Sequence, residues 1–99
     1  MATYWLSFRL TDDRTYSERY KNLTDTVQNL STKWWVEASS FIVFASASSI
    51  DQIASAISDV IYIDTDVVIL GMPEFKSARL IGHHEDEDIF ELIPFIKKV

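Results

Sequence analysis

The chain changes its hydrophobic period in a fixed order between Thr3 and Leu70. Apolar residues recur at every second position, then at a spacing near 3.6. The period of two then returns in two successive segments, followed by another helical segment and a last segment of period two. A period of two is typical of a strand, and a period of 3.6 of an amphipathic helix. The pattern therefore predicts strand, helix, strand, strand, helix, strand, an order that closes one sheet with both helices on one face.

The first predicted strand and helix have clear patterns. In Tyr4–Leu10 the apolar side chains alternate with Trp5, Ser7 and Arg9, so one face of the strand is apolar. After a polar turn, Thr15 and Glu18 have the spacing of a capping box, and we expect the helix to begin there. Its apolar stripe recurs at intervals of three and four residues: Tyr16, Tyr20, Leu23, Val27 and Leu30.

The second half of the pattern adds three strands and a helix. Lys33–Ala38 and Ser40–Ala45 are predicted strands, and the second is apolar on both faces, as in a strand central in a sheet. Ser48 or Ser49 is expected to cap the second helix. The stripe of that helix consists of Ile50, Ile53, Ala54, Ile57 and Val60 or Ile61. Val67–Met72 is the fourth strand and is again apolar on both sides.

These elements predict an α+β, ferredoxin-like βαββαβ domain over residues 1–82, with a four-stranded antiparallel sheet in the order four-one-three-two. The fourth strand would then lie at an edge, where two apolar faces favour aggregation unless something covers them. Lys76–Ile81 is an extra short strand that can pair with the sheet of a partner. We therefore expect a homodimer, whose predicted interface contains Trp5, Trp35, Val68, Leu70, Leu80 and Ile81.

Residues 83–99 form a tail that is first acidic and then apolar. Glu85–Asp88 is expected to start a short helix, because acidic residues favour a helix N-terminus. Pro94 limits that helix. Its predicted apolar stripe, which would dock on the body or on the partner subunit, consists of Ile89, Leu92, Ile93 and Ile96.

Composition excludes several kinds of site. The chain has no cysteine, which excludes disulfides, thiolate metal sites and cysteine nucleophiles. A formal net charge of −6 argues against a dominant role in binding nucleic acid. A local basic face remains an alternative through Arg9, Arg14 and Arg19, although we prefer a salt bridge from Arg9 to an acid such as Glu37. No cofactor is expected.

The sequence shows no targeting segment. The start, from Met1 to Tyr4, has neither a basic region nor a long apolar run, so we expect no secretory signal. The longest apolar runs have four or five residues, whereas a membrane span needs about 20. A cytoplasmic protein without a membrane partner is expected.

The tryptophans suggest an interface. Trp34 and Trp35 point to opposite sides of one strand, so one of them must leave the face that the helices cover. We expect Trp5 to join it there. Burial in a dimer is the preferred explanation, since tryptophan is enriched in interface hot spots. Burial under the tail and stacking on nucleic-acid bases are the alternatives.

Two segments, Tyr4–Leu10 and Trp34–Val43, resemble the SinR-like branch of the small CRISPR-associated adaptation-nuclease superfamily. The resemblance covers roughly residues 3 to 72. It implies a ferredoxin-like fold and a homodimer in which late strands embrace the partner's sheet. In that superfamily the first strand often ends in an aromatic-Asp-aliphatic triplet, whose paired aspartates are proposed to hold a divalent cation. Here the triplet is Phe8-Arg9-Leu10, and arginine brings a positive charge to that position.

The expected function is therefore that of a small homodimeric binding module rather than an enzyme. One alternative is a Mg²⁺- or Mn²⁺-dependent nuclease that uses Asp12 or Asp13. Another is an acidic regulator that captures a basic protein through Glu85–Asp88. His83 and His84 offer metal ligands beside these acids. Because no third histidine and no cysteine exists, a solvated polar segment is the preferred interpretation.

Overall fold

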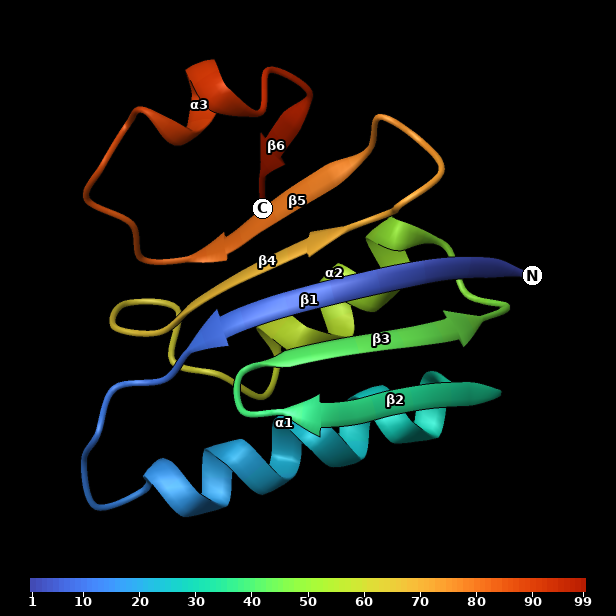
Figure 1. Ribbon diagram of the computed structural model, residues 1–99. Helices are drawn as coiled ribbons and strands as arrows, with labels where there is room; N and C mark the ends of the chain where they lie inside the picture. The colour runs from blue at the N-terminus through green and yellow to red at the C-terminus, as the bar shows by residue number, and fades with distance from the viewer.

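The computed structural model describes all 99 residues, which form one six-stranded mixed sheet and three helices (Figure 1). The strand order is β2-β3-β1-β4-β5-β6. In chain order the elements are β1 (Ala2–Arg9), α1 (Tyr16–Leu30), β2 (Lys33–Ala38), β3 (Phe41–Ser46), α2 (Ile50–Ser58), β4 (Val67–Gly71), β5 (Ala78–Gly82), α3 (Ile89–Leu92) and β6 (Ile96–Lys98). The first six confirm the predicted strand–helix order. The α+β class is confirmed, whereas a purely antiparallel four-stranded sheet is wrong.

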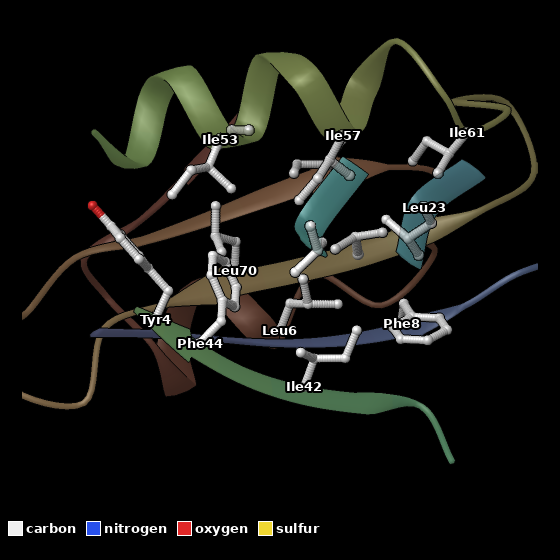
Figure 2. Packing of buried hydrophobic residues seen from close by; sticks show 14 of the residues in the cluster. Tyr4, Leu6, Phe8, Leu23, Ile42, Phe44, Ile53, Ile57, Ile61 and Leu70 are labelled. Carbon is white, nitrogen blue, oxygen red and sulfur yellow. The ribbon is translucent and has the colours of Figure 1, made fainter. Parts of the chain in front are cut away.

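Both long helices lie on one face of the sheet, which is how the alternating strands bury their apolar side (Figure 1). Figure 2 shows Ile53 and Ile57 of α2 pointing toward Tyr4, Phe44 and Leu70 on the strands. The sheet residues of this core come from β1, β3, β4 and β5, and the helical residues from the predicted stripes. Its fully buried members include Leu6, Leu23, Val27, Ile42, Phe44, Ile53, Ile57, Val68, Leu70 and Ile81.

The two helices begin differently. Ser49 caps α2 as predicted, since its hydroxyl accepts from the N–H of Gln52 and the Gln52 side chain accepts from the N–H of Ser49. The capping box predicted at Thr15 and Glu18 is wrong. The side chain of Thr15 makes no capping hydrogen bond to α1, because its hydroxyl is bonded to Asp13 and Arg19 instead.

The fourth strand is not an edge, which corrects the prediction. β4 pairs with β1 on one side and with β5 on the other, so the chain covers this edge itself. Val68, Leu70 and Ile81, predicted at a subunit interface, therefore lie in the core between sheet and helices. Leu80, predicted with them, lies on the opposite face and is 1% exposed.

Gly82 ends β5 with φ of 94°, and a Cβ there would collide with the carbonyl oxygen of Asp66.

The tail packs on the same chain and adds a strand that the sequence pattern did not predict. β6 pairs in parallel with β5, and Ala78, Leu80 and Ile96 form a second apolar cluster. A short helix after the acidic run is confirmed. Its predicted apolar stripe is wrong in two positions. Leu92 is 77% exposed and Ile96 belongs to β6, while Phe90 packs against the cluster.

No helix combines the length and the apolar character that crossing a membrane requires.

Candidate functional site

The face of the sheet opposite α1 and α2, here called the open face, carries the exposed aromatic residues. Strand alternation places Trp5, Ser7 and Arg9 of β1 on it, because Tyr4, Leu6 and Phe8 point into the core. No element crosses in front of β2, β3 and β1 on this side (Figure 1), whereas the tail packs against the open side of β4 and β5. The open face is therefore uncovered over half of the sheet.

Trp5 is seated on the open face by two neighbours. Its ring stacks on that of Phe41, with 6.3 Å between the centroids and 24° between the planes. On the other side its indole lies against Gly71, the cross-strand partner of Trp5, where an added Cβ would come within 2.5 Å of the ring. A glycine at position 71 is thus what lets the indole lie flat on β4.

Two further large side chains of this face, one stacked on Trp5 and one a strand beyond it on β2, are partly exposed. Trp35 is 45% exposed and Phe41 is 36% exposed. Val43 lies between Trp35 and Trp5 in the cross-strand register and is half-buried. We call Trp5, Trp35, Phe41 and Val43 the aromatic patch. Contiguous apolar surface of this kind marks an interaction site more often than isolated exposed residues do.

Two hollows lie on the open face, and only the first is lined by residues of the patch. One, of about 290 Å³, is lined by Thr3, Lys33, Trp34, Trp35, Val43, Phe44 and Ala45. The other, of about 300 Å³, lies between the tail and the open face of β1, β4 and β5. Its lining residues include Arg9, Ile69, His83 and His84. Arg9 is exposed and takes part in none of the ion pairs of the chain.

The salt bridge expected between Arg9 and Glu37 does not form. Arg9 lies on β1 and Glu37 on β2, and β3 runs between these two strands. Neighbouring strands are about 4.8 Å apart, so two side chains separated by a whole strand start roughly 10 Å from each other. Arg14, the second predicted phosphate contact, is exposed in the turn before α1.

Arg19, the third predicted phosphate contact, is instead 3% exposed and bound to Asp66, which is 0% exposed. Arg19 Nε donates to Asp66 Oδ2 at 2.9 Å, and its Nη1 donates to Asp13 Oδ1 at 2.8 Å. Its guanidinium lies 4.2 Å from the ring centroid of Tyr62. The backbone N–H groups of Thr11 and Tyr62 donate to the same Asp66 carboxylate. This cluster ties the β1–α1 turn to the segment before β4.

The environment of the cluster fixes its charges. Burial by itself raises the pKa of Asp66, but the hydrogen bonds from Arg19, Thr11 and Tyr62 outweigh that cost and hold the pKa below its ordinary value. The hydrogen bond from Arg19 likewise lowers the pKa of Asp13. The carboxylates in turn raise the pKa of Arg19 through their hydrogen bonds, so the guanidinium stays charged.

The residues predicted as metal ligands do not gather. Asp13 is bound to Arg19 and Thr15, while Asp12 is exposed in the same turn. His83 Nε2 is 3.6 Å from Glu85, and His84 Nε2 is 3.2 Å from Glu87. No group of three or more His, Asp or Glu side chains lies close enough to hold one metal ion.

The acidic run Glu85–Asp88 is exposed throughout and leads into α3. Within it the carboxylate of Asp86 accepts a hydrogen bond from the N–H of Asp88, which orders the turn before the helix.

Of the residues predicted at an interface, only Trp5 and Trp35 reach the surface. No protein-family model, curated protein or solved structure matches this chain.

Proposed function

We propose that this chain is a small binding module, related to the SinR-like branch of the CRISPR-associated adaptation proteins, and that it acts as a homodimer joined through the aromatic patch. The single observation that carries the proposal is the exposure of Trp35 and Phe41 beside the stacked ring of Trp5. The order of the first six elements supports the proposed relationship, whereas β5 pairs within its own chain and not with a partner's sheet.

Energetics favour burial of this patch. Large aromatic side chains dominate interface energies, and tryptophan is enriched among the residues that cost most when they are truncated. An interface of ordinary size buries about 800 Å² on each partner. That is a modest share of the 6057 Å² that the chain exposes.

The proposed dimer therefore uses the open face of the sheet and not the edge of β4. The expectation from the sequence rested on a bare fourth strand, and β5 covers that strand within the chain. The residues of the aromatic patch belong to β1, β2 and β3, the strands that the tail leaves uncovered (Figure 1). A second copy is the occupant we propose there.

Binding rather than catalysis is proposed because arginines, and not free carboxylates, occupy the positions where a metal ion would be held. Arg9 stands where the resemblance expects a metal-binding aspartate, and it points a cation onto the open face. Asp13, a candidate ligand for the nuclease alternative, is held by Arg19 at 2.8 Å. Cleavage of RNA or DNA by the purified protein with Mg²⁺ or Mn²⁺, lost in Asp12→Asn, would contradict this part of the proposal.

The proposal is tested by the mass of two variants. Trp35→Thr removes the most exposed ring of the patch and keeps a residue that suits a strand. Phe75→Thr removes an aromatic ring that is 60% exposed in the turn between β4 and β5 and is not part of the patch. Light scattering at micromolar concentration is expected to give a monomer for Trp35→Thr and a dimer for Phe75→Thr. Equal masses for the two variants would refute the role of the patch.

A further inference from the structure

The part of the open face that the tail packs against contains the hollow of about 300 Å³, here called the tail hollow. Arg9 of β1 pairs with Val67 of β4, and Val67 pairs with Gly82 of β5, so these residues form one row across the sheet. The row has no side chain at its β5 end, where the chain swings away and returns through α3 (Figure 1). A larger residue cannot fill this space, because a Cβ on Gly82 would collide with the carbonyl oxygen of Asp66.

The floor of the tail hollow is aliphatic. Val67, Ile69 and Leu80 contribute from β4 and β5, and Ile89 contributes from α3. All four belong to the second apolar cluster or pack against it, but only Leu80 is fully buried. A smaller hollow of about 150 Å³ shares Arg9, Val67 and Ile69 with the tail hollow, so the two form one groove. Small-molecule sites are typically concave and mostly apolar, with a few polar groups that orient the ligand.

The guanidinium of Arg9 is the charge at this groove that has no counterion. Arg9 lines both hollows, is exposed and takes part in none of the ion pairs of the chain. The two acids of the tail hollow have other contacts. Glu85 lies 3.6 Å from Nε2 of His83, and Asp86 accepts the hydrogen bond from the N–H of Asp88. A guanidinium offers a planar fork of N–H donors that matches a carboxylate.

We infer that the tail hollow binds a small monocarboxylate with an apolar chain, whose carboxylate pairs with Arg9 and whose chain lies on Val67 and Leu80. One guanidinium balances one negative charge. A phosphate group, which carries more charge, fits less well because Glu85 and Asp86 line the same hollow and repel it. A cavity of about 150 Å³ accepts benzene, so the tail hollow has room for a chain of about eight carbons. The site lies within one chain, and the inference does not depend on the proposed homodimer.

Octanoate is the probe, and octanamide, which has the same chain without the charge, is the matched control. Binding is followed by NMR through the backbone amide shifts of nitrogen-labelled protein. Octanoate is expected to shift the amides of Val67, Ile69 and Leu80 until they saturate, and to leave those of Trp35 and Val43 in the aromatic patch unchanged. Octanamide is expected to bind about tenfold more weakly or worse, because it lacks the charge-assisted hydrogen bonds.

Two arginine variants test the anchor of the carboxylate. Arg9→Gln is expected to weaken octanoate binding about tenfold, whereas Arg14→Gln should leave it unchanged. Arg14 is an equally exposed arginine that lines neither hollow, and the amide spectrum of each variant shows that it is folded. Equal affinity for octanoate and octanamide, or an unchanged affinity in Arg9→Gln, would overturn the inference. So would the absence of saturable shifts at β4 and β5. The mass of the chain without octanoate tests the homodimer separately.

Discussion

Arg19 and Asp66, 47 residues apart in the chain, form an ion pair at 2.9 Å in which neither side chain is more than 4% exposed. Every buried side-chain nitrogen and oxygen of the molecule has a hydrogen-bond partner, so this charged cluster is fully satisfied. It links the turn before α1 to the turn before β4, and thereby fixes where the second half of the sheet begins.

Asp66→Asn is predicted to destabilise the fold strongly. The substitution keeps the shape of the side chain but leaves the buried guanidinium of Arg19 with Asp13 as its only carboxylate partner. Breaking one side of a buried pair costs about 3 kcal/mol or more. Urea denaturation measures this loss. Lys21→Met, which removes the exposed pair with Asp25, is the control and is expected to cost less than about 1 kcal/mol.

The same cluster predicts acid sensitivity. The pKa values of Asp13 and Asp66 are lowered from 3.8 in the folded chain. The unfolded chain therefore takes up protons first as the pH falls, and the stabilisation is complete above the ordinary pKa and lost as the pH falls through the lowered values. Urea midpoints should drop between about pH 5 and about pH 2. Asp66→Asn should show a smaller drop, and an equal drop would count against the cluster as its source.

How far the sequence predicted the fold depends on how local each signal is. Periodicity within single segments indicated β1 to β4 and both long helices correctly. β6 has three residues and no detectable period, and it exists because β5 offers it an edge. The pairing of β5 with β4 was open to prediction, because consecutive strands joined by a short turn usually pair.

The candidate site was predicted only in part for a similar reason. Alternation placed Trp5 and Trp35 on the face away from the helices, and the structure agrees. The stack on Phe41 and the hollow beside it depend on cross-strand register, which no single segment encodes. The buried position of Arg19 could have been predicted from the sequence. It lies three residues after Tyr16 on the apolar stripe of α1, where a charged residue needs a buried partner.

Gly71→Ala is predicted to disturb the aromatic patch. The added methyl group would stand 2.5 Å from the indole of Trp5, so the ring must move off β4. Overpacking of this kind costs about 1–3 kcal/mol. Tryptophan emission should shift and the dimer should weaken. Ser77→Ala, in the loop that precedes β5, is the control, and an unchanged emission spectrum for Gly71→Ala would show that the indole does not need the glycine.

Substitutions at Phe90 and Leu92 test how the tail packs against the second apolar cluster. Phe90 packs against the second apolar cluster and lies edge-on to His84, with 5.4 Å between the ring centroids. Leu92, two residues later, is 77% exposed. Phe90→Ala is therefore expected to cost about 1–3 kcal/mol and Leu92→Ala less than about 0.5 kcal/mol in urea denaturation. The reverse order would mean that the tail does not pack in this way.

Sedimentation equilibrium of the unmodified chain, at several micromolar concentrations, tests the central claim that the chain pairs with a second copy of itself. The account predicts twice the chain mass of 11.4 kDa, falling toward a single chain only on dilution. A mass of one chain at every concentration would contradict it.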